Sequence, residues 1–289
     1  MTGLAPVVTV ILPVRNGKRT IFAAVKSICE QSFENWELLI LDDGSTDGFL
    51  TAINSIRDER IIPVVRGDGQ GLAARLNQGI DLAKGKYIAR MDADDIAFPE
   101  RFIRQVSYLE SHPEVDLLGT RAIVFRDEGS VVGMLPFAHS HADICARPWN
   151  NFPLAHPTWM GRAEWFRTYR YRIPEFRRAE DQELLLRSYS ESTFACLPEV
   201  LLAYRQGRFC AKKTLSGRTS LLRAQLQHFI RCGDVGSIFK SLTWFGLKSL
   251  VDLVASLPGA DSLYFKRMNA SPSPESAQHF KILYEMYCA

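Results

Sequence analysis

The stretch Lys86–Asp95, KYIARMDADD, joins a short apolar run to a cluster of acidic residues. Residues 86–91 predict a buried strand that stops where Asp92 begins. Asp92, Asp94 and Asp95 lie within four residues, and carboxylates so close repel one another unless a cation is present. Mg²⁺ and Mn²⁺ take carboxylate oxygens and fill their remaining positions with phosphate oxygens and water. We therefore expect a metal ion that bridges a diphosphate; the plainer alternative is a solvated acidic turn that caps the next helix.

Three similar apolar runs precede this segment, and helical patterns separate them. The expected strands cover residues 7–12, 36–41, 61–65 and 86–91. The expected helices cover residues 19–31, 50–56 and 72–84. Pro13 is expected to end the first strand, and Gly85 to end the third helix in the usual C-terminal position. This alternation predicts an α/β/α sandwich with a mostly parallel central sheet.

Polar residues follow three of the expected strands directly. They are Arg15, Asn16 and Gly17 after the first strand, Asp42 and Asp43 after the second, and the 92–95 cluster after the fourth. Ligands of such sheets bind at the carboxyl ends of the strands, so these clusters are expected to form one site.

Three other α/β classes do not fit the spacing of these motifs. Gly67-Asp68-Gly69-Gln70-Gly71 approaches a dinucleotide-binding fingerprint, but Leu72 stands where the third glycine is needed. The P-loop pattern is absent from the sequence. A phosphoacceptor receiver domain would carry its acidic pair and its nucleophile after the first and third strands, which does not match the order seen here.

The composition is that of an ordinary globular protein. Of the 289 residues, 46% are hydrophobic and 23% charged, which excludes a largely disordered chain, a collagen-like repeat and a disulfide-scaffolded mini-protein. A net charge of +3 gives no reason to expect nucleic acid as a partner. The six cysteines form no C-x-x-C pair. The N-terminal segment lacks a basic leader, so a cytoplasmic location with reduced thiols is expected.

The C-terminal part is basic and contains an apolar segment. From Arg205 onward there are 12 Lys/Arg and 5 Asp/Glu, a net charge of +7, so the preceding residues carry −4. Lys248 and Asp252 interrupt the segment 241–257, which is too short for a membrane span and has its apolar residues mostly on one helical face. It predicts a helix that packs on the domain or lies in a membrane interface. The basic charge fits an anionic phospholipid surface or a merely solvated face.

A series of ordered motifs resembles the family 2 inverting glycosyltransferases, of the bacterial polysaccharide and cell-surface glycan type. The motifs are VTVILPVRNG, LLILDDGSTDG, GLAARLNQGIDLAKGKYIARMDADDIAFPERF, LAHPTWMGR, EFRRAEDQELLLR and LPEVLLAYR. They cover about residues 7–206. The resemblance implies the GT-A fold, a Rossmann-like fold of nucleotide-diphospho-sugar transferases.

The resemblance also implies which residues bind the donor. The implied nucleotide-sugar ligands are Pro13, Arg15, Asn16, Asp42, Asp43, Gly71, Arg75, Asp92, Ala93 and Asp94. Asp42 and Asp43 would face the uracil and the ribose, Asp92 would lie near the ribose, and both Asp92 and Asp94 would hold Mn²⁺ or Mg²⁺, Asp94 most directly. One departure from the family pattern is that Arg75 comes one position early, with Leu76 where the arginine is expected.

Glu180 and Asp181 form the second implied catalytic element. The apolar pattern that follows them predicts a helix that begins at this pair, and the positive end of a helix favours an ionised carboxylate. The resemblance makes Asp181 the general base that takes the proton of the acceptor hydroxyl. His156, Trp159 and Arg178 are candidate contacts to the acceptor or the diphosphate; the alternatives are a structural histidine, a core tryptophan and a solvated arginine.

These observations predict an inverting, metal-assisted transfer of a sugar from a nucleotide diphosphate, most simply a UDP-sugar, to a glycan or lipid-linked acceptor. Residues 1–206 would form the transferase domain, with 1–100 as donor half and 101–206 as acceptor half. Residues 207–289 would form a basic helical extension that contacts the inner membrane face peripherally. Two alternatives stay open: a sugar-phosphate nucleotidyltransferase, and a non-catalytic binding protein on a degenerate transferase fold.

Overall fold

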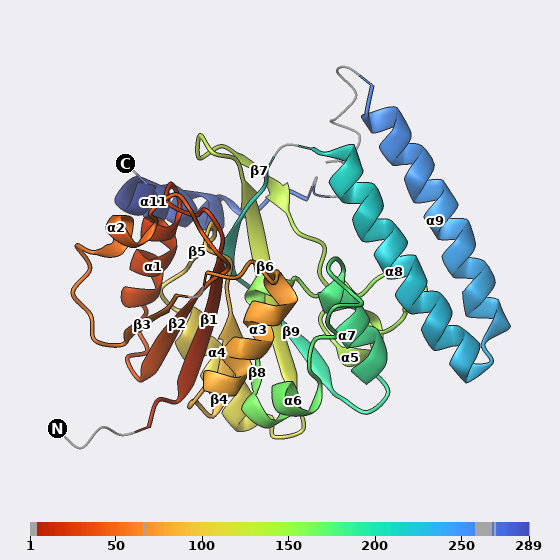
Figure 1. Cartoon of the computed structure of the whole chain (residues 1–289), viewed down its shortest axis with the longest axis horizontal. Coiled ribbons are helices and arrows are strands. Elements are labelled where there is room, and N and C mark those ends of the chain that lie inside the picture. Colours follow the sequence, from red (N-terminus) through yellow and green to blue (C-terminus); the bar gives the residue numbers. More distant parts are fainter. Residues whose placement is uncertain (1–4, 66, 208, 258–267, 269, 289) are drawn as a thin grey trace.

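The structure is a computed structural model that describes the chain except residues 1–4, 66, 208, 258–267, 269 and 289. Its centre is a nine-stranded sheet, in which eight strands follow the order β3-β2-β1-β4-β8-β6-β9-β5 and β7 pairs with β6. Figure 1 shows helices on both faces of this sheet and a helical hairpin beside it. None of the helices in the described part is long and apolar enough to cross a lipid bilayer.

The strands and helices have the following bounds. The strands are β1 (Val8–Val14), β2 (Trp36–Asp42), β3 (Ile61–Val64), β4 (Tyr87–Arg90), β5 (Ile96–Ala97), β6 (Leu117–Phe125), β7 (Val131–Met134), β8 (Met160–Arg162) and β9 (Phe194–Arg205). The helices are α1 (Ile21–Cys29), α2 (Leu50–Ile53), α3 (Leu72–Leu82), α4 (Arg101–Ser111), α5 (His141–Ile144), η1 (His156–Thr158), α6 (Ala163–Thr168), α7 (Glu180–Ser188), α8 (Ala211–Cys232), α9 (Val235–Ala255) and α11 (Pro274–Cys288).

The N-terminal half of the sheet is parallel, as the sequence predicts. β1 pairs in parallel with both β2 and β4, and β2 pairs in parallel with β3. Beyond β4 the sheet is mixed, because β8 runs antiparallel between β4 and β6 while β6 and β9 are parallel. The carboxyl ends of β1, β2 and β4 therefore meet at one edge, where the expected polar clusters lie.

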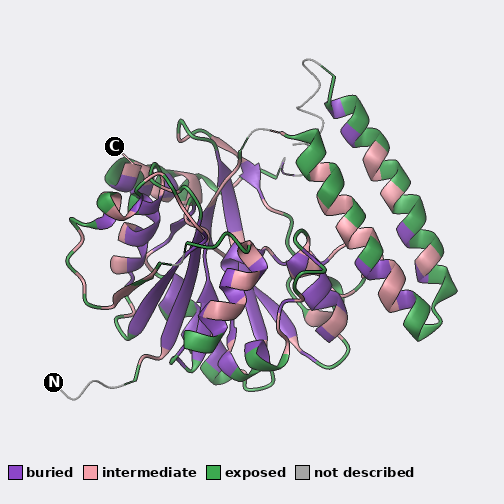
Figure 2. Ribbon diagram, viewed as in Figure 1, coloured by how far each residue is buried: buried purple, intermediate pink, exposed green. Residues whose placement is uncertain are grey.

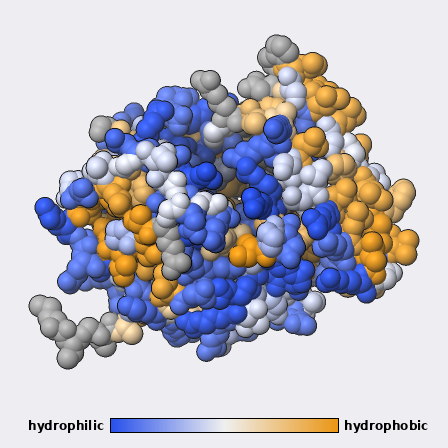
Figure 3. All heavy atoms as spheres, in the orientation of Figure 1, coloured by the Kyte–Doolittle hydropathy of each residue, from blue (hydrophilic) through white to orange (hydrophobic). Residues whose placement is uncertain are grey.

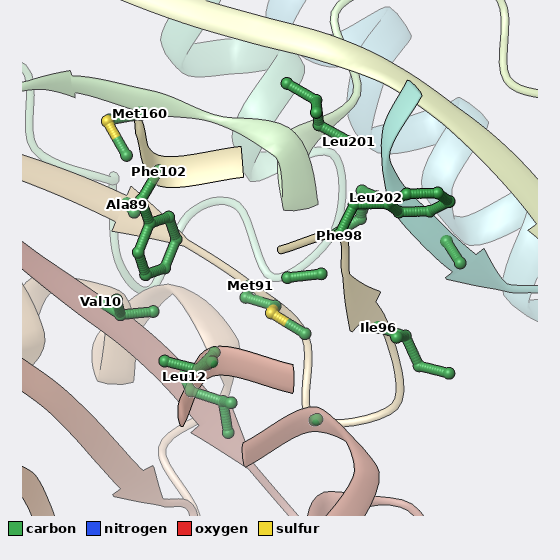
Figure 4. Packing of buried hydrophobic residues seen from close by; sticks show 14 of the residues in the cluster. Val10, Leu12, Ala89, Met91, Ile96, Phe98, Phe102, Met160, Leu201 and Leu202 are labelled. Carbon is green, nitrogen blue, oxygen red and sulfur yellow. The ribbon is translucent and has the colours of Figure 1, made fainter. Parts of the chain in front are cut away.

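Two apolar cores lie on the two faces of the sheet. Val8, Val10 and Leu12 of β1 face the core formed with α1 and α4, whereas Ile11 points into the core formed with α3, α6 and α7. This alternation follows from the two-residue period of a strand. Figure 4 shows Val10 and Leu12 packed near Phe102 in the first core. Figure 2 shows that the central strands are buried along most of their length, because helices cover both faces of the sheet.

Two local expectations need correction. Pro13 does not end the first strand, because β1 continues to Val14. The backbone carbonyl of Ile11 points toward β4 and accepts from the amide of Met91. The backbone of Pro13, two residues later, points to the same side, but Ile11 is the last residue of β1 that pairs with β4. The missing N–H of Pro13 therefore costs no ladder hydrogen bond.

Gly85 is required by close packing and does not act as a left-handed helix cap. It is not among the residues with a positive φ. A Cβ at this position would lie 2.5 Å from the backbone nitrogen of Thr9. The strand β1 therefore passes too close to position 85 for any side chain.

The C-terminal part does not behave as a single extension. α8 and α9 form an antiparallel hairpin at the side of the sandwich (Figure 1), whereas α11 returns to the first core. Phe280, Leu283 and Tyr287 of α11 are buried there with residues of the sandwich. α8 and α9 thus lie outside the sandwich, whereas α11 packs against it.

Candidate active site

The loops after β1 and β2 are fastened to each other at the carboxyl edge of the sheet. Asn16 adopts a left-handed backbone conformation with φ of 55°. Its Oδ1 accepts from the amide of Thr46 at 2.9 Å, and its own amide donates to Oγ of Ser45 at 2.9 Å. Asp42 accepts from the amide of Ser45 at 2.9 Å. Asn16 and Asp42 therefore shape this edge through turn hydrogen bonds.

Asp43 is buried and accepts hydrogen bonds from Arg75 of α3 and from Gly71, the residue just before α3. Its carboxylate accepts from Nε of Arg75 at 3.0 Å and from the amide of Gly71 at 2.9 Å. Gly71 has φ of 97°, a conformation that favours glycine. The guanidinium of Arg75 also binds Asp68 and Gln78, and only 3% of its side chain is exposed. Arg75, one position early in the motif, is thus a buried partner of Asp43, while Leu76 packs in the core.

A cavity of about 900 Å³ lies in front of these residues. Its lining includes eight of the predicted or implied site residues, namely Pro13, Arg15, Asp43, Gly71, Arg75, Arg178, Glu180 and Asp181. The volume lies within the usual range of small-molecule sites. The guanidinium of exposed Arg15 lies 3.8 Å from Asp43, so the cavity has both positive and negative groups for a polar ligand.

Asp92, Asp94 and Asp95 converge after β4. One carboxylate oxygen from each lies within 4.8 Å of the others. Asp94 is the exposed member of the cluster, and partial desolvation together with the nearby Asp92 charge raises its pKa to about 6. Asp95 is completely buried, and its Oδ2 has no hydrogen-bond partner among the described residues. Three carboxylates at this spacing, in a cluster that also holds a buried oxygen without a hydrogen-bond partner, fit a hard divalent cation.

Two buried arginines, Arg90 and Arg101, support this cluster through hydrogen bonds, and neither was predicted from the sequence. Arg90, 4% exposed, donates from its two terminal nitrogens to the two oxygens of Asp92, at 2.8 and 2.5 Å. Arg101 is fully buried and donates to the carbonyl of Arg90 at 2.8 Å, and burial lowers its pKa to about 9. The sequence signal that could have identified Arg90 is its charge within an otherwise apolar strand.

Glu180 and Asp181 begin α7, as predicted. Ala179 just before them has φ of 55°, an uncommon conformation for alanine that costs about 1–2 kcal/mol and often marks functional sites. Burial, more than the neighbouring Asp181 charge, raises the pKa of Glu180 to about 7. Burial also raises the pKa of Asp181, while the charge of Arg90 lowers it. Desolvation therefore outweighs the helix-end effect expected from the sequence.

A second cavity, of about 970 Å³, lies between the sandwich and the α8–α9 hairpin. On the sandwich side it is lined by His156, Asp181 and Gln182 together with twelve residues between Leu135 and Ala155, and on the hairpin side by seven residues of α8 and α9. Gln182 holds the loop at Phe152, accepting from its amide at 2.8 Å. Among the described residues, Asp181 alone lines both large cavities. Asp181 therefore lies between the two cavities.

The three remaining candidates have different places. His156 is buried, lies 2.8 Å from the hydroxyl of Tyr171 through Nε2, and has its pKa lowered by burial. Arg178 is exposed and lines the first cavity. Trp159 is completely buried, and its Nε1 donates to the carbonyl of Leu154 at 3.2 Å. The expectation that Trp159 contacts a ligand is therefore corrected: its indole is part of the core.

The comparisons with known proteins agree with this fold. Two solved structures share it. TarS of S. aureus in complex with UDP has a TM-score of 0.60 and 16% identity, and the match covers 97% of this chain and 90% of TarS. The mannosyltransferase PcManGT of Pyrobaculum calidifontis in complex with GDP-Man and Mn²⁺ has a TM-score of 0.58 and 18% identity, and the match covers 99% of this chain and 87% of PcManGT. At these identities the likeness shows the GT-A-like fold alone.

Closer relatives are found by sequence. The putative glycosyltransferase EpsE of Bacillus subtilis is 39% identical over 193 residues, which are 64% of this chain and 68% of EpsE. The UDP-Glc:alpha-D-GlcNAc-diphosphoundecaprenol beta-1,3-glucosyltransferase WfaP of Escherichia coli is 38% identical over 104 residues, 36% of this chain and 41% of WfaP. Residues 9–170 match the family described as Glycosyl transferase family 2. The sandwich, the residues at its edge and these matches together establish that the chain belongs to glycosyltransferase family 2.

Proposed function

We propose that the chain transfers a sugar from a UDP-sugar to a hydroxyl of a glycan or lipid-linked acceptor, with inversion at the anomeric carbon. The donor would occupy the cavity of about 900 Å³ and the acceptor that of about 970 Å³. The observation that carries the proposal is the position of Asp181 between them. A group that removes a proton from the acceptor while the donor is attacked must reach both substrates.

On the donor side, Asp43 is the proposed reader of the nucleotide. Its carboxylate is held by Arg75 and the amide of Gly71, so it is fixed before a ligand arrives. A carboxylate fixed in this way accepts hydrogen bonds from a base N–H or a ribose hydroxyl without first being ordered. Arg15 and Arg178 supply positive charge toward the diphosphate from two sides of the cavity. UDP and UDP-GlcNAc complexes of TarS and the GDP-Man complex of PcManGT make a nucleotide-sugar the natural ligand class.

Asp92 and Asp94 are the proposed ligands of Mn²⁺ or Mg²⁺, with Asp95 behind them. The bound ion would neutralise charge on the departing diphosphate. Arg90 fixes both oxygens of Asp92 and so orients this carboxylate toward the cluster. Each carboxylate oxygen retains a lone pair for a cation when it already accepts one hydrogen bond.

The proton and bond changes balance with Asp181 as base. The acceptor hydroxyl gives its proton to the carboxylate of Asp181 as its oxygen forms a bond to the anomeric carbon. The bond between that carbon and the diphosphate oxygen breaks, and the nucleoside diphosphate leaves with the electron pair. One displacement inverts the anomeric centre. The raised pKa of Asp181 makes it a stronger base than an exposed aspartate, which suits this task.

The names of two relatives and the basic charge of the hairpin support the proposed acceptor class. WfaP is named for an alpha-D-GlcNAc-diphosphoundecaprenol acceptor, and AmsE of Erwinia amylovora is named for amylovoran biosynthesis. We propose the same setting here: synthesis of a cell-envelope polysaccharide, with the chain at the cytoplasmic side and peripheral contact with the membrane.

A nucleotide panel tests the donor site. UDP, GDP, TDP and CDP are each added with Mn²⁺, with and without EDTA, and the melting temperature is recorded. A ligand at about 100 times its Kd adds about 2.7 kcal/mol of stability. We expect the largest shift with UDP, abolished by EDTA. A shift with UDP that EDTA leaves unchanged would contradict the metal site, and no shift with any nucleotide would contradict the donor site.

A further inference from the structure

Helix α9 has its large apolar residues on the outside. Its buried residues are Ser237, Ser241, Asp252 and Ala255, all polar or small. The inner face is held by an ion pair between Asp252 and Arg218 of α8. This arrangement reverses the usual one, in which a helix buries its apolar stripe.

The outer face of α9 carries an apolar stripe. The exposed apolar residues of α9 that follow one helical line are Val235, Phe239, Leu242, Leu250 and Leu253. Phe239 is 72% exposed and Leu253 68%. Figure 3 shows hydrophobic atoms gathered over the part of the surface where α9 lies in Figure 1. A patch of this extent on an otherwise polar protein marks a contact surface.

The charge of the hairpin identifies what covers this stripe. Residues 211–255 contain seven Lys/Arg and two Asp/Glu, a net charge of +5. The exposed basic residues on α8 and α9 are Lys212, Lys213, Arg223, Arg231 and Lys240. An apolar stripe flanked by basic side chains complements an anionic lipid bilayer. A second copy of the chain would bring like charges together, which disfavours self-association through this face.

The second cavity lies between the hairpin and the proposed base. Leu221 of α8 and Trp244, Leu247 and Val251 of α9 supply apolar residues on its hairpin side, and Asp181 lines its sandwich side. Leu247 and Val251 are 51% and 47% exposed, so these apolar side chains also reach the surface of α9. The hairpin side of the cavity thus combines apolar side chains that reach the surface with the charged Arg218, Lys248 and Asp252, a mixture that suits an acceptor with both a lipid anchor and a polar head.

We propose that the α9 stripe inserts into an anionic bilayer and that the cavity takes its acceptor from that bilayer, lipid along α9 and sugar hydroxyl at Asp181. This deepens the proposed function and rests on it for the role of Asp181. The docking surface itself stands on the exposed stripe and the charge of the hairpin.

Vesicle flotation of the full chain tests the surface. Vesicles of phosphatidylcholine with phosphatidylglycerol are compared with pure phosphatidylcholine at low and high salt. The variant is Phe239→Glu with Leu253→Glu, and the matched control is Ile282→Glu with Met286→Glu on α11, whose side chains are also exposed. We expect binding to anionic vesicles that weakens with salt, and a loss of about tenfold or more in the α9 variant only. Equal loss in both variants, or a stripe-dependent dimer without vesicle binding, would overturn the proposal.

Quenching by brominated lipid tests the route into the cavity. Trp244 lines the hairpin side of the cavity and stacks on Trp149, with 6.0 Å between the ring centroids. In vesicles with brominated acyl chains, bound protein should lose emission, and Trp244→Phe should remove most of this quenching. Bound protein whose emission is unquenched would refute the route. The shift in melting temperature with UDP and Mn²⁺, measured on each variant, reports on the donor site separately. If the wild type binds vesicles but shows no such shift, the proposed function is refuted and the proposed docking surface is not.

Discussion

Replacing Arg75 by methionine tests how the donor site is built. Arg75 is 3% exposed and binds Asp43 at 3.0 Å, Asp68 at 2.8 Å and Gln78 at 2.8 Å. Removing one partner of a buried ion pair costs about 3–5 kcal/mol, because the other charge stays buried and unpaired. Asp43 keeps the amide of Gly71, so we expect the lower end, about 3 kcal/mol. Methionine retains the apolar stem of the arginine, which limits the packing loss.

The assay is urea unfolding at neutral pH, with nucleotide affinity measured on the same samples. Lys26→Met is the control, because Lys26 and Glu30 form an exposed pair on α1 for which a change well below 1 kcal/mol is expected. The Arg75 variant should also bind UDP more weakly, since Asp43 is no longer fixed. Unfolding free energies that fall by no more than in the control would refute this account of Asp43 and Arg75.

Three further predictions concern packing, protonation and the metal. Gly85→Ala should destabilise the chain by about 1–3 kcal/mol, seen as a lower urea midpoint, because its Cβ would strike the backbone of Thr9; an unchanged midpoint would show that β1 yields easily. Because the folded state raises the pKa of Glu180 to about 7, this carboxyl stabilises the fold at pH 4 and loses that contribution as the pH rises through 7. Glu180→Gln should therefore flatten the fall in unfolding free energy between pH 4 and 8, and an unaltered slope would exclude Glu180 as its source. Asp94→Asn should lower the affinity for UDP in the presence of Mn²⁺ by about tenfold or more in calorimetry, but change it little in EDTA; equal effects in both conditions would argue against Asp94 as a metal ligand.

The N-terminal half of the fold follows closely from the sequence. The expected strands and helices lie within a few residues of β1 to β4 and α1 to α3. Each of these elements carries a local signal: a β-branched run, a helical period or a turn residue. The meeting of the polar clusters at one edge follows from the parallel order of those strands.

The remainder depends on contacts between distant residues. No local pattern shows that β8 enters the sheet antiparallel between β4 and β6, or that α11 returns to the first core. The properties of the site residues likewise depend on contacts between distant parts of the chain. Asp92, Asp94, Glu180 and Asp181 stand out in the sequence, but the burial that raises the pKa values of Glu180 and Asp181 depends on the assembled sandwich. Arg75 illustrates the limit best, because its role depends on Asp43 at the end of another strand.

The most direct test of the central claim is the turnover of Asp181→Asn. Asparagine keeps the shape of the side chain but cannot take the acceptor proton. We expect kcat to fall by about 10²–10⁴-fold while the affinity for UDP with Mn²⁺ stays within a few-fold. Glu110→Gln, an exposed carboxyl on α4, should keep full activity. Turnover of Asp181→Asn equal to that of the wild type would contradict the assignment of Asp181 as the base between the two cavities.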